Sequence, residues 1–376
     1  MDRHGTSSVK WNRYKDRDVI PMWVADMDFR SPPAVIEALH QHVEHGVFGY
    51  TEAPEELIEV IISRLKADCN WQIQPEWIVW LPGLVTGLNV ACRAVGKDGD
   101  DVMTIVPAYP PFLSAPKYSG RNLITVELKQ EQNRWGFDFD QIENSITPKT
   151  RLFVLCNPHN PAGRVFTRQE LDTLCEICQK HEIIICSDEI HCGLVLDENK
   201  KHIPTAILSP EIEDRTITLM APSKTFNLPG LGCSFAIISN ERLRRDIRRA
   251  MSGIVPFVNT LGFTAALAAY RDSREWHSAL LAYLRKNRET LEQFIESIPG
   301  LSMSHVEATY MGWIDTSAAG LKNPAQFFEN AGVGLSDGTY FNGPGFVRLN
   351  FGCSHSMLLK ALRRMGKALG SVLPGR

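Results

Sequence analysis

The 376-residue sequence has no apolar run of membrane-spanning length, no low-complexity tract and no internal repeat. It also lacks a charge excess, because 40 Lys and Arg face 43 Asp and Glu, so we expect no attraction to nucleic acid or anionic membranes. Residues 1–5 form no apolar secretory segment, and we expect a cytoplasmic protein. These absences favour an ordinary globular chain.

Paired cysteines are also missing. The nine cysteines are odd in number and lie mostly within apolar stretches, which favours reduced, buried thiols over disulfides. Cys175 and Cys178 do form a C-x-x-C, but they lie within 167–180, where the pattern predicts an amphipathic helix. No second pair stands at zinc spacing, so we expect no metal site.

What is present is an alternation of helical and strand patterns. Helical spacing of apolar residues recurs in 32–45, 54–67, 84–95 and 167–180. Short apolar runs lie between or after them, at 77–80, 102–106, 152–156, 183–186 and 216–220. Strands this apolar are covered on both faces, which predicts an α/β fold with a mostly parallel sheet between helices. Such sheets bind ligands at the carboxyl ends of their strands.

The length exceeds the size at which a single core usually divides, and the pattern changes after about residue 263. A long helical stretch at 274–298 is followed by short strands at 310–315 and 346–350, which predicts a smaller α+β lobe. We expect an N-terminal segment (1–40) that packs with the small lobe, a large domain (41–270) and a small C-terminal domain (271–376).

Polar residues follow three of the predicted strands. Asn160 lies in a turn-forming run after strand 152–156, Asp188 follows strand 183–186, and Lys224 lies in a Pro/Gly-flanked loop after strand 216–220. Each residue alone has a simpler interpretation: a turn, a helix N-terminal acidic pair with the next residue, and a solvated lysine. Together they predict an amide, a carboxylate and an amine at one crevice.

These three groups suit pyridoxal phosphate (PLP). A carboxylate keeps the pyridine nitrogen of the cofactor protonated, so that the ring acts as an electron sink. An amide binds the phenolate oxygen, and a lysine amine of lowered pKa condenses with the aldehyde. The sequence therefore predicts a PLP site built around Lys224.

In the order and spacing of these residues, the chain resembles the fold-type I, class I/II aminotransferases over nearly its whole length. Asp188 stands 28 residues after Asn160, Lys224 stands 36 residues after Asp188, and Arg348 follows in the run Val-Arg-Leu-Asn. The resemblance implies that Lys224 forms the Schiff base and shuttles the Cα proton. It also implies that Asp188 pairs with the pyridine nitrogen and Asn160 binds the ring oxygen. Arg348 would clamp the substrate carboxylate, as a planar guanidinium can do with two hydrogen bonds.

The same resemblance assigns the rest of the cofactor site. The turn that opens helix 84–95, at Leu84 and Val85, would bind the phosphate through backbone N–H groups. Tyr109 would stack on the cofactor, its alternative being a core tyrosine. Tyr50 would reach the phosphate of a neighbouring subunit, which implies a homodimer with shared active sites.

Two departures from the broad family stand out. Gly232 replaces the phosphate-binding arginine that many members carry eight residues after the lysine, so phosphate binding would depend on the helix end, Ser223 and Tyr50. His191 replaces the usual tyrosine three residues after Asp188. Its imidazole either donates a hydrogen bond to the ring oxygen or only packs beside it.

With the segment Pro21–Phe29, these features resemble a narrower group, the MalY/PatB-type carbon–sulfur β-lyases. That group cleaves cystathionine, cysteine or S-conjugated cysteines to a thiol, ammonia and pyruvate, and Trp23 and Ala25 would border the substrate pocket. Two alternatives stay open. One is an aminotransferase of a neutral or aromatic amino acid, which shares every step up to Cα deprotonation. The other is a regulatory interaction protein with secondary lyase activity.

Overall fold

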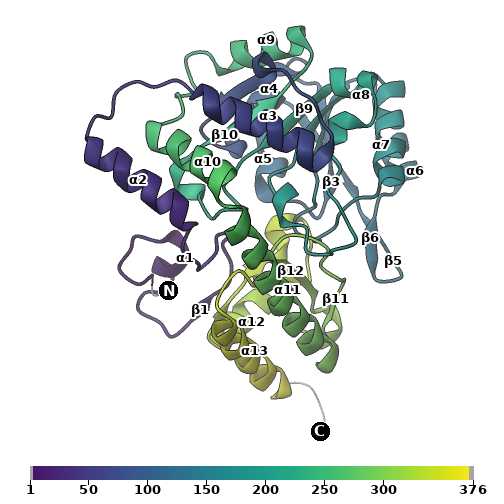
Figure 1. Cartoon of the computed structure of the whole chain (residues 1–376). Helices are drawn as coiled ribbons and strands as arrows, with labels where there is room; N and C mark the ends of the chain where they lie inside the picture. Colours follow the sequence, from purple (N-terminus) through teal and green to yellow (C-terminus); the bar gives the residue numbers. More distant parts are fainter. Residues whose placement is uncertain (1–2, 372–376) are drawn as a thin grey trace.

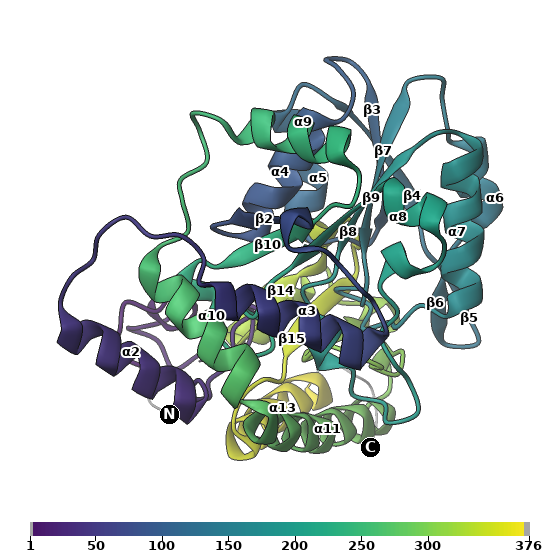
Figure 2. The ribbon, with the colours of Figure 1, turned by 45° about the horizontal axis from the view of Figure 1, so that its top comes forward.

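The computed structural model describes residues 3–371, in which a large sheet lies between helices and a smaller α+β body adjoins it (Figures 1 and 2). The large sheet has seven strands in the order β2-β10-β9-β8-β7-β3-β4. Strand β10 is antiparallel to both of its neighbours, and all other neighbouring strands of this sheet are parallel. The prediction of a mostly parallel sheet is confirmed. The strands are β2 (Ile78–Leu81), β3 (Asp101–Val106), β4 (Asn122–Glu127), β7 (Thr150–Cys156), β8 (Ile184–Asp188), β9 (Thr216–Met220) and β10 (Ser234–Ile237).

Alternate residues of these strands pack against helices on opposite faces of the sheet. On one face Val102, Leu152 and Val154 pack against α4 (Leu84–Ala94), α5 (Pro110–Tyr118) and α9 (Glu241–Met251). On the other face Met103 and Phe153 pack against α6 (Phe139–Asn144) and α7 (Arg168–Lys180). Further along that layer, α3 (Glu55–Cys69) and α10 (Thr260–Asp272) cover β2 and β10. Because both faces are covered, the strands read as continuous apolar runs.

Capping side chains define where several helices begin. Thr167 and Glu170 form a reciprocal capping box at the start of α7, and Asn259 and Asn240 accept hydrogen bonds from the first turns of α10 and α9. By contrast, α4 begins at Leu84 without any side-chain cap, which leaves its first N–H groups available to a ligand. The remaining helices of this part are α1 (Val9–Asn12), α2 (Pro33–His45) and α8 (Pro210–Asp214).

The smaller body is built on a four-stranded sheet in the order β11-β12-β15-β14. Its core is shared with the long helix α11 and the C-terminal helix α13. Its elements are α11 (Arg274–Ser297), β11 (Ser302–Met303), β12 (Met311–Asp315), α12 (Pro324–Asn330), β13 (Val333–Gly334), β14 (Ser336–Asp337), β15 (Phe346–Asn350) and α13 (His355–Gly370). Within residues 3–371 no helix combines the length and the apolar character needed to cross a membrane.

The N-terminal segment runs between the two bodies. Strand β1 (Ile20–Pro21) pairs in parallel with β13, and the Asn350 N–H donates to the Met22 carbonyl. On the other side, Asn227 donates to the Met27 and Phe29 carbonyls. These contacts connect the segment to the small body and to the lysine loop, while the boundaries at residues 40 and 270 stay predictions.

In the large body, two strands and one hairpin lie outside the strands predicted from the sequence. Strand β4 lies at the sheet edge, where half of its six residues are exposed, and β10 begins two residues after Gly232. The hairpin β5 (Lys129–Glu131) and β6 (Arg134–Gly136) is mostly exposed. Strand pairing within the tertiary fold selects these segments, because their local patterns are weak.

Arg164 is a fully buried guanidinium that connects the two bodies. Its Nη1 lies 2.6 Å from both carboxylate oxygens of Glu307, and its Nε donates to the Trp135 carbonyl at 2.6 Å. Replacing Arg164 with alanine is expected to lower the free energy of unfolding by about 3–5 kcal/mol, since the buried Glu307 carboxylate loses the one fully buried cation among its partners, which also include Lys200. Urea denaturation measures this.

Arg134 provides the control for that variant. It also lies within ion-pair distance of Glu307, at 3.8 Å, but its side chain is 45% exposed. Arg134→Ala is expected to cost less than about 1 kcal/mol. Equal losses of unfolding free energy in Arg164→Ala and Arg134→Ala would contradict the expectation that burial makes the Arg164 ion pair the stronger one.

Candidate active site

Three adjacent strands bring the predicted polar residues to one edge of the large sheet. Strands β7, β8 and β9 are neighbours, and Asp188 stands in register with Cys156 and Leu219 at their carboxyl ends. Asn160 follows β7 by four residues and Lys224 follows β9 by four. The crevice at a sheet's carboxyl edge is where open α/β folds bind ligands.

Lys224 points from its loop toward the N-terminal segment. Its Nζ donates to the Ala25 carbonyl at 2.7 Å, and the Tyr310 hydroxyl donates to the same oxygen at 3.1 Å. Burial and the nearby Arg348 charge together lower the pKa of Lys224 to about 8. The amine is therefore much more often neutral near pH 7 than an exposed lysine.

Asp188 is a buried carboxylate with little hydrogen bonding. Its Oδ1 accepts from the Ile190 N–H at 3.1 Å, and burial raises its pKa to about 7. A cationic group placed beside it would restore the ionised form. This environment suits a partner that carries a proton on a ring nitrogen.

Arg348 on β15 is buried without an anion. Its Nη1 donates to the Asn160 Oδ1 at 3.1 Å, its Nη2 donates to the Trp23 carbonyl at 2.9 Å, and its charge lies 4.5 Å from the Phe341 ring centre. Its Nε is buried and has no acceptor, and no carboxylate of residues 3–371 forms an ion pair with the guanidinium. A buried guanidinium in this state is prepared for an incoming carboxylate.

The turn after β7 explains how Asn160 reaches Arg348. Gly163 has φ +67, and a Cβ there would lie 2.9 Å from Val306 Cγ1. A left-handed conformation and close packing both favour glycine at this position. The Gly163 carbonyl in turn accepts from the Ala308 N–H, which attaches the turn to the small body.

A cavity of about 420 Å³ opens onto the reactive groups. Five of the predicted residues line it: Trp23, Ala25, Tyr109, Lys224 and Arg348. Asn160 and Asp188 lie behind Arg348 and Lys224, in contact with or electrostatically coupled to them. Two bodies and the N-terminal segment thus contribute to one site.

Four other predicted cofactor residues, Leu84, Val85, His191 and Ser223, do not line this cavity. Leu84 and Val85 occupy the uncapped start of α4, and Ser223 precedes Lys224 in its loop. His191 is buried, and its Nδ1 has no hydrogen-bond partner. Burial and the nearby Lys224 and Arg348 charges lower the pKa of His191 to about 3, so the ring is neutral and can serve as a donor or acceptor.

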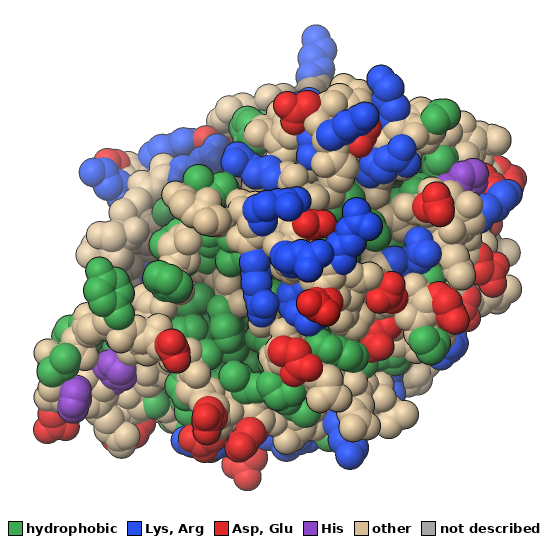
Figure 3. Space-filling view, turned by 90° about the horizontal axis from the view of Figure 1, so that it is seen from above, with side chains coloured by type: hydrophobic (Ala, Val, Ile, Leu, Met, Phe, Trp, Pro, Cys, Tyr) green, Lys and Arg blue, Asp and Glu red, His purple; other side chains and the backbone are tan. Residues whose placement is uncertain are grey.

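Tyr50 lies away from Lys224 within a single chain. Its side chain is fully exposed and lines a different, mostly apolar cavity of about 1190 Å³ beside Trp80 and Phe257. Seen from above, hydrophobic side chains gather in a hollow next to a group of Lys and Arg side chains (Figure 3). The assignment of Tyr50 to a neighbouring subunit's phosphate stays a prediction.

Several residues at the site were not predicted from sequence. Asn227 anchors the N-terminal segment to the lysine loop, Tyr310 shares the Ala25 carbonyl with Lys224, and Phe341 covers the Arg348 charge. The Asn350 amide donates to the carbonyls of residues 24 and 26. Asn227 could have been proposed from the sequence, since it lies three residues after Lys224 in the loop that the sequence analysis had identified.

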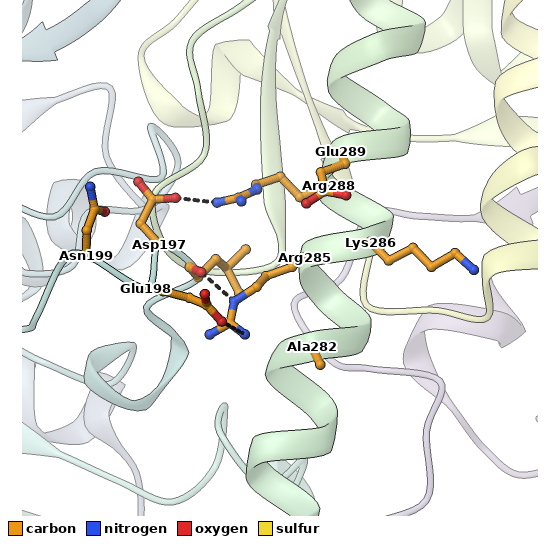
Figure 4. Close-up of a pocket in the computed structure, with 9 residues that line it drawn as sticks. Asp197, Glu198, Asn199, Ala282, Arg285, Lys286, Arg288 and Glu289 are labelled. Atoms are coloured by element: carbon orange, nitrogen blue, oxygen red, sulfur yellow. Dashed lines mark hydrogen bonds and ion pairs between the residues drawn. The ribbon is translucent and has the colours of Figure 1, made fainter.

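A second hollow, between α11 and the loop after β8, lacks the features of a reactive site. Arg288 pairs with Asp197 at 2.5 Å and Arg285 pairs with Glu198 at 2.8 Å, as the dashed lines mark (Figure 4). Its principal charges therefore compensate one another. The cavity at Lys224, with its anion-free Arg348, is the stronger candidate.

Comparison with known proteins identifies the family of the chain. The model of the class I and II aminotransferases matches residues 17–365. The chain belongs to this family. Among curated relatives, cystathionine beta-lyase PatB of Bacillus subtilis is 38% identical over 98% of each chain.

Solved structures extend the likeness to three dimensions. The crystal structure of OvoB is 47% identical, with a TM-score of 0.97 over 99% of this chain and 98% of the other. Cystalysin from Treponema denticola, which contains a pyridoxal 5'-phosphate cofactor, is 32% identical, with a TM-score of 0.95 over 99% and 98%. The chain therefore has the fold of this family over its whole described length.

Proposed function

We propose that the protein is a PLP-dependent carbon–sulfur β-lyase that cleaves cystathionine or a related cysteine thioether. One observation carries the proposal: a lysine of lowered pKa and an arginine without an anion line the same cavity. A primary amine and a carboxylate clamp together recognise an α-amino acid. The activity of the PatB relative supports the choice of a cysteine thioether among amino acids.

The residues around the cavity fit PLP. Lys224 would hold its aldehyde, Asp188 its ring nitrogen, and Asn160 its ring oxygen. The buried, unpartnered Nδ1 of His191 gives a further polar atom that a ring substituent could satisfy. When bound, PLP supplies an aldehyde for the substrate amine and a protonated ring that withdraws electrons from Cα.

The phosphate would lie at the uncapped start of α4. The N–H groups at Leu84 and Val85 and the helix dipole both favour an anion there. Gly232, where many relatives have an arginine, has φ +57 and supplies no charge. Ser223 and Tyr50 would therefore complete phosphate binding, and Tyr109 would stack on the ring.

Lys224 and Arg348 divide the work on the substrate. Arg348 binds the α-carboxylate and orients the Cα–H bond, while the neutral Nζ of Lys224 removes that proton. The Ala25 carbonyl, 2.7 Å from Nζ, then accepts a hydrogen bond from the ammonium that forms. The Cβ–S electron pair leaves on sulfur as a thiolate. Addition of water to the three-carbon remainder releases ammonia and pyruvate.

Pyruvate release without a keto-acid acceptor tests this reaction. Purified holoenzyme with L-cystathionine alone is expected to release pyruvate, thiol and ammonia in equal amounts. The family match favours a second candidate, an aminotransferase of a neutral or aromatic amino acid. Strict dependence on an added keto acid would contradict the lyase and support the aminotransferase.

The pH dependence of PLP uptake tests the Lys224 assignment. The cofactor-free protein is expected to react with PLP faster as the pH rises through about 8, because only the neutral amine attacks an aldehyde. Stopped-flow absorbance in the visible range measures the rate. A rate that rises only near the ordinary lysine pKa of 10.5 would contradict a buried reactive amine.

We also propose a homodimer with shared active sites. Tyr50, Phe257 and Ile254 are 105%, 86% and 59% exposed, which is unusual for apolar side chains on a monomer. A second copy of the chain would cover them and bring Tyr50 to its phosphate. Nine unpaired cysteines support a reducing, cytoplasmic location.

A further inference from the structure

The outer end of the Lys224 cavity carries charges that the proposed reaction does not use. Five formally charged side chains line the cavity: Arg13, Lys224, Glu329, Asp337 and Arg348. Lys224 and Arg348 act at Cα and at the α-carboxylate. The other three come from the N-terminal segment and the small body, and belong to the part of the cavity that a substrate's side chain would occupy.

Arg13 is positioned but not paired. Its guanidinium carbon lies 4.7 Å from the Trp23 ring centre and 5.5 Å from that of Tyr14, and within residues 3–371 the guanidinium has no hydrogen-bond or salt-bridge partner. Contact with these two aromatic rings orients the planar guanidinium of Arg13. The Trp23 carbonyl meanwhile accepts from Arg348, so one residue contacts both guanidinium groups of the cavity.

The two carboxylates differ in how far they are already satisfied. Glu329 is compensated, because Arg17 lies 2.7 Å from its Oε1 and the Tyr14 hydroxyl donates to its Oε2 at 3.1 Å. Asp337 has no ion pair among the described residues; its Oδ1 accepts from the Thr339 N–H and hydroxyl, both at 2.8 Å. The Arg13 charge also helps to lower the pKa of Glu329, but neither Arg13 nor Asp337 has a salt-bridge partner among residues 3–371.

We propose that Arg13 and Asp337 determine substrate specificity by binding the carboxylate and the ammonium at the far end of a thioether that joins two amino acids. This inference rests on the proposed function. The planar set of N–H donors on the Arg13 guanidinium suits a carboxylate, and the second carboxylate oxygen of Asp337 suits an ammonium. A leaving group of plain alkyl or aryl chemistry would desolvate both charges without pairing them, which disfavours it.

Two substrates that differ only at the distal end separate binding by Arg13 and Asp337 from the reaction at Cα that both substrates share. S-Propyl-L-cysteine is L-cystathionine without the distal ammonium and carboxylate. Arg13→Gln in the holoenzyme is expected to raise KM for cystathionine about 10-fold, with kcat and the S-propyl-cysteine constants unchanged within about twofold. Asp337→Asn is expected to do the same. With S-(3-carboxypropyl)-L-cysteine, which keeps the distal carboxylate and lacks only the ammonium, only the Arg13 variant should show the effect.

Two control variants test whether the effect depends on the position and on the charge of Arg13. Lys15→Gln removes the same charge two residues away without lining the cavity and should change nothing. Arg13→Lys should recover part of the loss. Equal changes for both substrates, or no change for either, would overturn the proposal. If the wild type releases pyruvate from neither cystathionine nor S-propyl-cysteine, the proposed function fails. In that case the Kd of cystathionine, measured by calorimetry, tests this inference separately. An unchanged Kd in Arg13→Gln would overturn it.

Discussion

Replacing Lys224 with alanine is expected to lower pyruvate release from cystathionine by at least about 10³-fold. The change removes the proton acceptor at Cα and the amine that holds the cofactor, and each role contributes substantially to the rate. A coupled pyruvate assay measures kcat. After dialysis, the visible absorbance of the cofactor–lysine bond should also be absent.

Two further variants isolate the chemistry of that amine. Lys224→Arg keeps a cation of similar length, but its guanidinium stays protonated and cannot act as a nucleophile, so it should be as inactive as alanine. Lys201→Ala removes an exposed lysine and should leave turnover unchanged. Near-normal turnover in either Lys224 variant would show that another group removes the proton.

Replacing Arg348 with alanine is expected to lower kcat/KM by about 10²–10³-fold. The substrate carboxylate would lose two charge-assisted hydrogen bonds in a buried site, where such a loss costs about 2–5 kcal/mol. The Asn160 Oδ1 and the Trp23 carbonyl would also lose their donors. Steady-state kinetics measure the effect, and PLP absorbance checks that the cofactor is still bound.

Arg348→Lys tests whether geometry or charge dominates. A lysine restores the charge but not the planar pair of donors, so its kcat/KM should lie between those of wild type and alanine. Arg363→Ala on the exposed face of α13 is the control and should behave as wild type. An alanine variant with an unchanged KM and kcat would remove Arg348 from substrate binding.

Much of the fold was predictable because buried elements impose strong patterns. The helices α2, α3, α4 and α7 begin and end within two residues of their predicted bounds. Strands β7, β8 and β9 were predictable because both of their faces are covered. Edge strand β4 was not predicted, because only one of its six residues is buried and its pairing with β3 defines it.

The candidate site also contains residues that were predictable from sequence and residues that were not. Asn160, Asp188 and Lys224 were predictable because each follows a recognisable strand in a turn-forming run. Arg13 was not, because an arginine in a segment without regular pattern has no local sign that it lines a cavity 211 residues from Lys224 in the chain. Tyr50 also stays undecided, since one chain alone leaves it exposed.

The sequence by itself determined the strand order in the chain, the residue types at the strand ends and the resemblance that names their chemistry. Those features are local, or are carried by spacing along the chain. Only the tertiary structure decided which charges meet. Burial lowers the pKa of Lys224, Arg348 lacks an anion, and Arg13 lines the same cavity because three distant segments converge there. Solvation and electrostatic pairing depend on distances in space, which spacing in sequence does not specify.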